Sequence, residues 1–232
     1  MHAFGLVLLA LIAGTLPDEP EETLRRPVPA RRSARPVRSA RRRTRRTRAT
    51  AGAAIVTPDR RLLEDTILPA FAADRSFARV LWVGCRENTV GYARAFGSRF
   101  HTLEIDPDAA RFGVRGRHVT DSIVNLGRHY PARYFDLIFM NGILGFGVDD
   151  TATAEQALAA CVKGLRKGGW LVLGWNDLPE HAHLHPYERE ALAGMEPVEL
   201  AALGTSTVEV TFRAPVRGGT WTHTYDFLRR LR

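Results

Sequence analysis

Cysteine is scarce in this chain: its 232 residues include only Cys85 and Cys161. Two cysteines are too few for the disulfide framework of a small secreted domain, and their spacing fits no zinc motif. Both lie in apolar segments, so we expect small buried residues. The chain also has no G-x-S-x-G, P-loop or H-E-x-x-H motif, which removes three familiar signatures of hydrolases and nucleotide triphosphatases.

Long hydrophobic runs are also missing. The most apolar stretch, residues 3–14, is shorter than the roughly 20 residues that a membrane-spanning helix needs. It has the length of a signal peptide, but no Lys or Arg precedes it. We therefore expect a cytoplasmic protein, with membrane association of the N-terminus left open.

The excess of positive charge is confined to the N-terminal part. Residues 1–50 contain twelve Arg, no Lys and four acids, whereas the remaining 21 basic and 21 acidic residues cancel. Residues 25–48 consist of Arg, Pro, Ala, Ser, Thr and Val without apolar periodicity, so we expect disorder there. The composition predicts two parts: a tail at 1–55 and a folded domain at 56–232.

Three interpretations of the tail remain open. The first is an N-terminal extension without a role, the second is a membrane-proximal anchor with a basic flank, and the third is an arm that binds nucleic acid. The last is disfavoured because no aromatic residues alternate with the arginines to stack on bases. The neutral body has no net field to attract nucleic acid, so its expected partner is a small-molecule substrate.

Strand-like and helix-like segments alternate after residue 58. Nearly all-apolar strands that alternate with helices indicate a parallel sheet covered on both faces. Residues 207–212 and 222–227 alternate in polarity around a turn-rich segment and predict a terminal antiparallel hairpin. The expected fold is α/β, Rossmann-like and doubly wound, mostly parallel, with that hairpin at the C-terminus. The predicted strands are residues 79–84, 100–105, 118–120, 135–140 and 170–175, and the predicted helices are 61–74, interrupted at Pro69, and 90–96, 122–129 and 153–165, the last stopped by residues 167–169.

Residues 79–108 are the most informative part of the sequence. They predict a buried strand, a turn with glycine, a short helix and a second strand that ends in acids. This is the first half of a nucleotide-binding βαβ unit, in which an acid after the second strand suits the two hydroxyls of a ribose. Glu104 is the preferred acid here. Asp106 is more simply a cap for the turn that begins at Pro107.

Five motifs occur in an order that resembles the class I S-adenosylmethionine-dependent methyltransferases. They are VLWVGC, LEIDPD, HVTDSI, FDLIFMNGILGFG and LRKGGWLVLGW, which span most of the folded part. The resemblance implies a seven-stranded methyltransferase-type domain, S-adenosylmethionine as cofactor, and methyl transfer to a small-molecule or glycan-like acceptor. The alternative is a catalytically inactive binding or scaffold protein with the same fold. A nicotinamide-dependent oxidoreductase is disfavoured by the terminal hairpin.

The resemblance also implies which residues bind the cofactor. The Gly84 turn would pass under the methionine part, Glu104 would bind the ribose, and Asp121 would accept from the adenine amino group. Asp121 is also a candidate helix cap. Asn141 follows the fourth strand and would face the reacting methyl group. The full expected set is Gly84, Cys85, Glu87, Glu104, Ile105, Asp121, Ser122 and Asn141.

The first glycine motif departs from the family pattern. Trp82 stands where the family usually has an acid for the ammonium group of the cofactor, and Arg86 and Asn88 replace glycines. Glu87 is the expected substitute carboxylate. These departures favour the inactive alternative.

No catalytic residue or metal site emerges from the sequence. Methyl transfer requires alignment more than a dedicated catalytic group. His181, His183 and His185 alternate and would share one side of an extended segment. Without supporting cysteines or acids, they are expected to form a surface loop and not a metal site.

Overall fold

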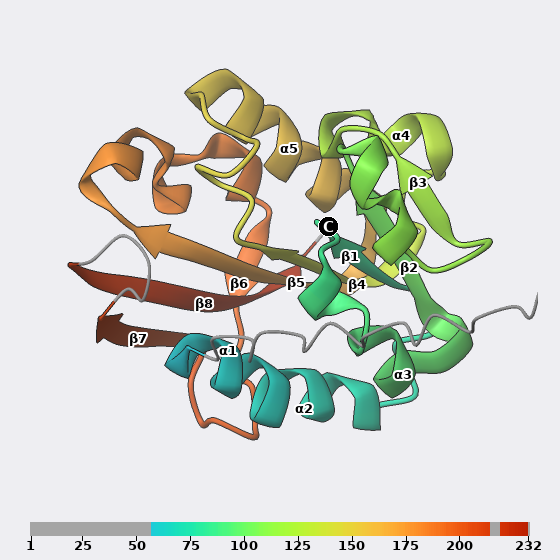
Figure 1. Ribbon diagram of the computed structural model, residues 1–232, viewed down its shortest axis with the longest axis horizontal. Helices are drawn as coiled ribbons and strands as arrows, with labels where there is room; N and C mark the ends of the chain where they lie inside the picture. Colours follow the sequence, from blue (N-terminus) through green and yellow to red (C-terminus); the bar gives the residue numbers. More distant parts are fainter. Residues whose placement is uncertain (1–56, 214–218, 232) are drawn as a thin grey trace, which may run out of the picture. The chain divides into compact units, whose positions relative to one another are not determined.

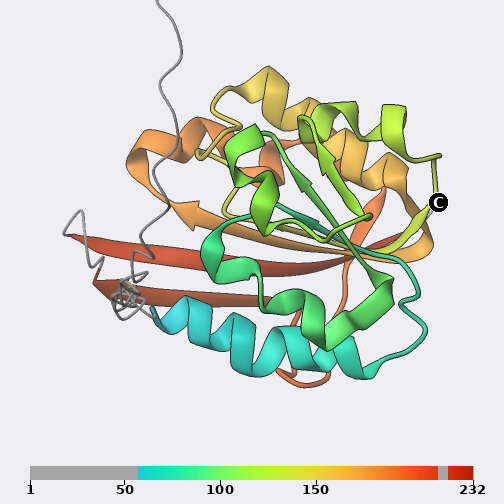
Figure 2. The ribbon, with the colours of Figure 1, turned by 45° about the vertical axis from the view of Figure 1, so that its right-hand side comes forward.

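A central sheet lies between two groups of helices. The computed structural model describes residues 57–213 and 219–231, so the expectations for the tail at 1–55 lie outside the described residues. Figures 1 and 2 show α1, α2 and α3 on one face of the sheet and α4 and α5 on the other. The expected α/β fold is confirmed.

The strands pair in the order β3-β2-β1-β4-β5-β8-β6, and β7 also pairs with β8. The first five strands are parallel, whereas β8 runs antiparallel to β5, β6 and β7. The terminal hairpin is therefore confirmed, and its second strand lies next to β5. The strands are β1 (Val80–Val83), β2 (Phe100–Glu104), β3 (His118–Thr120), β4 (Phe135–Asn141), β5 (Leu165–Asp177), β6 (Met195–Pro197), β7 (Thr207–Arg213) and β8 (Thr220–Arg230).

The helices are short, apart from α5. Asp150 caps α5 by accepting from the Thr153 N–H over 2.9 Å. The helices are α1 (Pro58–Leu62), α2 (Leu68–Ala73), α3 (Tyr92–Phe96), α4 (Leu126–His129) and α5 (Thr151–Gly164). Short 3₁₀ segments occupy Glu87–Thr89, Gly97–Arg99, Pro107–Phe112, Ile123–Asn125, Pro179–Leu184, Pro186–Glu188 and Glu190–Leu192.

The first helical segment is not interrupted at Pro69, contrary to the sequence expectation. A π-helical stretch, Leu63–Ile67, joins α1 directly to α2, and Pro69 lies in the first turn of α2. Proline lacks an N–H group, and the wider π turn just before it accommodates that loss without ending the helix. The segment starts three residues earlier than expected, at Pro58.

Each face of the sheet has its own apolar core. One core packs α4 and α5 on the sheet through residues such as Leu126, Leu158 and Ile138. The other packs α1–α3 on the opposite face through residues such as Phe71, Phe139 and Phe227. This two-sided burial explains why the parallel strands lack polar alternation.

Two further expectations can be compared with the structure. Cys85 and Cys161 are buried and unpaired, as expected, and burial raises the pKa of each thiol to about 12. The glycines at 168 and 169 do not end α5, which already ends at Gly164. They lie inside β5, because this strand begins at Leu165 and bulges opposite Phe135–Leu137. Within the described part of the chain, no helix is long and apolar enough to cross a membrane.

Candidate functional site

A cavity of about 750 Å³ opens at the carboxyl ends of β1, β2 and β4. Its volume falls within the range of about 300–1,000 Å³ that is usual for small-molecule sites. In open parallel sheets this edge is where ligands bind. Residues from distant parts of the chain meet there. They are Asp59 and Arg60 of α1, Gly84 after β1, Glu104 of β2, Ser122 and Ile123, residues 141–143 and 146–148 in and after β4, and Phe212, Trp221 and His223 of β7 and β8.

The turn after β1 keeps the one glycine that its geometry requires. Gly84 has φ +87°, a conformation that a residue with a side chain rarely adopts. Its N–H donates to the carbonyl oxygen of Leu103 over 2.8 Å, which ties the turn to β2. The buried indole of Trp82 donates to the carbonyl oxygen of Gly84. Trp82 therefore stabilises the turn through this hydrogen bond and supplies no carboxylate to the cavity.

Glu104 is a buried acid that organises this turn. Its side chain is 4% exposed. Oε2 accepts the Cys85 N–H over 2.6 Å and lies 3.0 Å from Nη1 of Arg86, while Oε1 accepts the Asp106 N–H over 2.9 Å. A carboxylate has about four lone-pair sites, so one remains when all three contacts are made. Displacement of Arg86 would free a second, which is the number that two ribose hydroxyls require.

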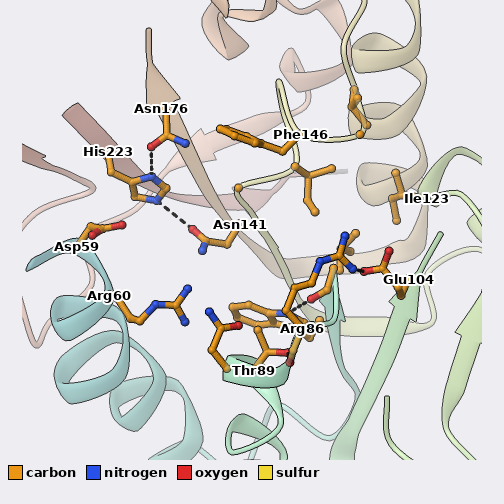
Figure 3. A pocket seen from close by; sticks show the side chains of 18 of the residues that line it. Asp59, Arg60, Arg86, Thr89, Glu104, Ile123, Asn141, Phe146, Asn176 and His223 are labelled. Atoms are coloured by element: carbon orange, nitrogen blue, oxygen red, sulfur yellow. Dashed lines mark hydrogen bonds and ion pairs between the residues drawn. The ribbon is translucent and has the colours of Figure 1, made fainter. Parts of the chain in front are cut away.

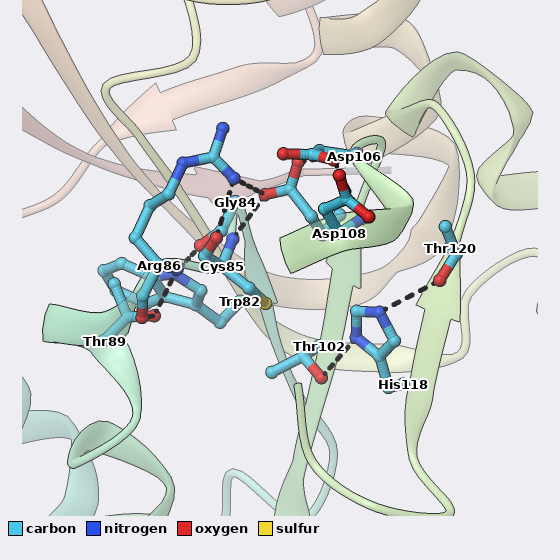
Figure 4. Close-up of polar contacts among 11 residues, drawn as sticks. Trp82, Gly84, Cys85, Arg86, Thr89, Thr102, Asp106, Asp108, His118 and Thr120 are labelled. Atoms are coloured by element: carbon cyan, nitrogen blue, oxygen red, sulfur yellow. Dashed lines mark hydrogen bonds and ion pairs between the residues drawn. The ribbon is translucent and has the colours of Figure 1, made fainter. Parts of the chain in front are cut away.

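Arg86 does not fill the turn in the way its bulk suggests. Its backbone is closed by Thr89, whose hydroxyl accepts the Arg86 N–H over 3.1 Å and donates back to the Arg86 carbonyl over 2.9 Å. The guanidinium reaches over the Cys85 carbonyl toward Glu104 and is 59% exposed. Figures 3 and 4 show this side chain extended, with its guanidinium at the carboxylate of Glu104. Arg86 is the exposed partner of this ion pair, and Glu104 keeps its two backbone N–H donors when the guanidinium moves away.

The rim beyond Glu104 is apolar. Ile105 lines the cavity although 57% of it is exposed, and Ile123 lines it from the loop after β3. Ser122 lies beside them, whereas Asp121 is not among the lining residues. Asp121 instead accepts from the Ser122 N–H, the Asn125 amide and His129, and these hydrogen bonds hold its pKa near 2. The N-cap position of the 3₁₀ turn Ile123–Asn125 is Ser122, without a side-chain cap hydrogen bond, so the expected helix cap at Asp121 is not observed. The role of Asp121 toward adenine stays a prediction.

A polar chain crosses the far end of the cavity, on β4, β5 and β8. The ring of His223 lies 3.0 Å from Oδ1 of Asn141 and 2.8 Å from Oδ1 of Asn176. Burial lowers the pKa of His223 to about 4, so the ring is neutral near pH 7. A neutral imidazole has one N–H and one acceptor nitrogen, so one of the two amides must present its NH₂ group. Gly174 makes room, since a Cβ there would collide with Asn141.

The first turn of α1 adds two charges to this end. Asp59 and Arg60 line the cavity, and Figure 3 shows both projecting from α1 toward it. The Asp59 carbonyl accepts from the hydroxyl of Tyr225 over 3.1 Å, which fixes the start of the helix against β8. The sequence reasoning missed these two residues because it began the helix at residue 61. The Thr57–Pro58 pair, with proline in the first helical turn, is the signal that could have placed them.

The structure brings five of the eight expected residues to the cavity. These are Gly84, Glu104, Ile105, Ser122 and Asn141. Cys85 contributes its backbone N–H to Glu104, but its side chain is buried elsewhere. Glu87 is exposed and, like Asp121, is not among the lining residues. The binding role of each residue stays a prediction.

The three histidines after β5 do not form a cluster. His181 packs edge-on against Phe146, with ring centroids 5.2 Å apart. His183 lies 3.1 Å from the Asp149 carbonyl oxygen, and His185 packs on Trp175. Across residues 57–213 and 219–231, no group of three or more His, Cys, Asp or Glu side chains could hold a metal ion.

The chain was compared with protein-family models, curated proteins and solved structures. No protein-family model and no curated protein matches the chain. Among solved structures, the chain is similar to the N-methyltransferase NodS from Bradyrhizobium japonicum WM9, with 18% identity, a TM-score of 0.49, and coverage of 72% of this chain and 94% of that one. It is also similar to a SAM-dependent methyltransferase from Archaeoglobus fulgidus, with 14% identity, a TM-score of 0.48, and coverage of 67% and 87%.

A third similar structure is the 1,6-didemethyltoxoflavin-N1-methyltransferase of Burkholderia thailandensis, with 17% identity, a TM-score of 0.47, and coverage of 72% of this chain and 77% of that one. The chain itself has an α/β fold with a mostly parallel central sheet and antiparallel strands at its C-terminal end. At these identities and TM-scores the likeness carries no weight for activity or acceptor, which must be argued from the residues of this chain.

The cavity residues suit S-adenosylmethionine, the cofactor that the sequence resemblance implies. Glu104 retains acceptor capacity for ribose hydroxyls, Ile105 and Ile123 offer apolar surface for a purine, and the Gly84 turn permits close approach. The remaining polar groups, on α1, β4 and β8, lie at the opposite end from this nucleoside side. Sequence reasoning also missed Ile123, Phe146, Trp221 and His223, which reach the cavity only through the tertiary fold.

Proposed function

We propose that this protein transfers a methyl group from S-adenosylmethionine to a small-molecule or glycan-like acceptor. The observation that carries the proposal is the cavity at the carboxyl ends of β1, β2 and β4, with a glycine turn and a buried acid on its nucleoside side. The same cavity continues to the neutral polar chain on β4, β5 and β8, so it has room for a second molecule beside the cofactor.

S-adenosylmethionine would supply an electrophilic methyl group when bound. Glu104 would accept hydrogen bonds from the ribose after Arg86 swings away, and its buried position makes these charge-assisted bonds strong. Ile105 and Ile123 would pack on the adenine. The protein otherwise needs to exclude water and align the acceptor, since alignment alone supplies much of the rate.

The acceptor side offers both rings and hydrogen-bonding groups. Phe146, Phe212 and Trp221 provide flat apolar surface, which suits a planar molecule or the face of a sugar ring. Asn141 and Asn176 provide amides that can orient hydroxyl or amino groups. These features favour a small molecule over a macromolecular substrate.

Calorimetric titration tests this proposal. S-adenosylmethionine and S-adenosylhomocysteine should both bind the full chain, and a nicotinamide dinucleotide should not. Glu104→Ala should weaken binding by about 1–3 kcal/mol, because the ribose loses a charged acceptor. If neither adenosyl compound binds at millimolar concentration, the enzymatic proposal fails and the inactive scaffold takes its place.

The inactive alternative is not favoured by the turn geometry. The observation that favoured this alternative is the presence of Arg86 and Asn88 in place of two glycines. Gly84 keeps the required backbone conformation, and Arg86 lies along the rim with most of its side chain exposed. The departures therefore leave the cavity open.

We also propose that residues 56–232 are the catalytic part and that residues 1–55 are dispensable for its stability. The composition of the tail offers too little apolar area to offset the entropy of ordering it. A chain that begins at Ala51 should melt at the same temperature as the full chain. Any affinity for nucleic acid should disappear with the tail and fall steeply with salt. A large loss of melting temperature would contradict this division.

A further inference from the structure

Two adjacent side chains of opposite charge face the cavity from α1. Asp59 and Arg60 are consecutive, and neighbours in a helix point in different directions, so they do not pair with each other. Of the residues that line the cavity, the acids are Asp59 and Glu104, and the basic residues are Arg60 and Arg86. Arg86 and Glu104 already form an ion pair. Asp59 and Arg60, by contrast, each keep part of their hydrogen-bonding capacity unused within the described part of the chain.

Asp59 has an unused carboxylate oxygen. Its Oδ1 is shielded from solvent and has no hydrogen-bond partner among the described residues. The contact with Tyr225 uses the main-chain carbonyl and leaves the side chain free. Burying a carboxylate oxygen without a donor is unfavourable, so such an atom next to a cavity indicates a ligand that carries a donor. The neighbouring His223 ring is already held by two amides.

Arg60 is held on one side only. Its Nη1 donates to the hydroxyl of Tyr92 over 3.0 Å and lies 3.5 Å from Oε1 of Glu64, and the Tyr92 hydroxyl in turn donates to Glu64. These contacts fix the direction of the side chain. Within the described part of the chain, Nη2 and Nε of Arg60 have no partner. A guanidinium with free N–H groups in a fixed position matches a carboxylate well.

The turn after β1 offers no competing carboxylate. Trp82 uses its indole N–H on the Gly84 carbonyl, and Glu87 is exposed outside the lining. A ligand cation at this end of the cavity therefore meets Asp59, and a ligand anion meets Arg60. A molecule that carries both charges on one carbon satisfies both residues at once.

We propose that Asp59 and Arg60 bind an α-amino-carboxylate group, with Asp59 on the ammonium and Arg60 on the carboxylate. Such a group forms the amino-acid end of S-adenosylmethionine and S-adenosylhomocysteine. This assignment rests on the proposed function, and it places the selectivity for a complete adenosyl amino acid on the first turn of α1. One ligand group would then pair with both the free carboxylate oxygen of Asp59 and the free N–H groups of Arg60.

The test uses two ligands that differ only in this group. S-adenosylhomocysteine has the amino-acid end, and 5′-methylthioadenosine lacks it but keeps the adenosine and the thioether. Each is titrated calorimetrically into the full chain. The wild type should bind S-adenosylhomocysteine at least about ten-fold more tightly, as expected for two charged contacts. Asp59→Asn and Arg60→Gln should each remove most of that preference and leave the affinity for 5′-methylthioadenosine within about two-fold.

Asp108→Asn is the matched control, because it removes one exposed acid that does not line the cavity. It should leave both affinities unchanged. Thermal melts should show that each variant is folded, and the ligand comparison on the wild type stands even if a variant does not fold.

Three outcomes would overturn the assignment. The first is a wild type with no preference between the ligands. The second is an equal loss of affinity for both ligands in Asp59→Asn. The third is retention of the full preference in both α1 variants, which would assign Asp59 to the acceptor. Each of these leaves the cofactor proposal intact if an adenosyl compound binds. Failure of the wild type to bind either ligand would overturn both.

Discussion

The two ends of the cavity hold their acids differently. Glu104, at the end proposed to bind the nucleoside, accepts two backbone N–H groups and pairs with a guanidinium, so its charge already stabilises the turn. Asp59, at the α1 end, has one carboxylate oxygen with no partner among the described residues. A satisfied buried acid stabilises the fold, whereas an unsatisfied one is available for a ligand. Substitution of Glu104 should therefore lower the stability of the fold, whereas substitution of Asp59 should mainly change ligand affinity.

The largest effect is expected from Glu104→Ala. Two backbone N–H groups of the turn would lose their acceptor inside the protein, and the free energy of unfolding should fall by roughly 3 kcal/mol. Urea denaturation measures this loss. Asp59→Ala is the informative partner, since it should change stability little or raise it. Equal losses at both ends would remove the distinction between them.

Acid should weaken the protein through His223. The pKa of this buried ring is lowered from 6.5 to about 4, so the unfolded chain takes up the proton first as the pH falls. Stability is complete above about pH 6.5 and should decline by about 2–3 kcal/mol toward pH 4. His223→Gln should flatten this dependence in melts at several pH values.

His101 provides a control for that measurement. Burial also lowers its pKa, but it lies in β2 away from the cavity lining. His101→Gln should remove a different part of the acid slope and leave ligand affinity alone. If the stability of His223→Gln depends on pH as steeply as that of the wild type, the loss of stability in acid does not come from protonation of the His223 ring.

A moderate effect is expected from Gly84→Ala. The φ of +87° strains any residue with a side chain, and the added Cβ would lie 2.8 Å from Cδ1 of Ile143. The expected loss is about 1–2 kcal/mol, with weaker cofactor binding. Gly91→Ala is the matched control, because a Cβ there meets nothing within 4 Å. Equal melting temperatures for the two variants would contradict the argument.

The smallest effect is expected from Arg86→Gln. Its ion pair with Glu104 is exposed on the arginine side, so stability should change by less than about 1 kcal/mol. Adenosine and S-adenosylhomocysteine should bind somewhat more tightly, since ribose no longer competes with the guanidinium. Weaker binding would mean that Arg86 itself contacts the ligand.

The sequence predicted the fold well and the site in part. Strands such as 118–120 and the terminal hairpin were recognisable because apolar runs and polarity alternation are local signals. Gly84, Glu104 and Asn141 were recognisable because they directly follow or end such strands. Continuity through Pro69 was missed, because a π turn leaves no clear sequence signature.

Residues that reach the cavity through long-range packing could not be predicted. His223 faces Asn141 only because β8 inserts beside β5, a pairing between segments 47 residues apart at the Asn176–His223 contact. Ile123 has no sequence signal of its own, whereas Asp59 could have been placed in the first turn of α1 from the Thr57–Pro58 pair before it. Glu87 looked suitable from its place in the turn, yet the 3₁₀ turn that begins there leaves it exposed. The direction of a side chain in a turn depends on geometry that residue order does not specify.

The position of β8 has a consequence for biosynthesis. This strand is translated after every other strand of the described sheet, yet it occupies an interior place between β5 and the pair β6 and β7. It supplies Tyr225 and Phe227 to one core and His223 to the cavity. A nascent chain lacking β8 would expose the edge of β5 while still on the ribosome, and such edges recruit other strands. Premature termination before residue 220 should therefore yield aggregates and not a partly folded, soluble chain.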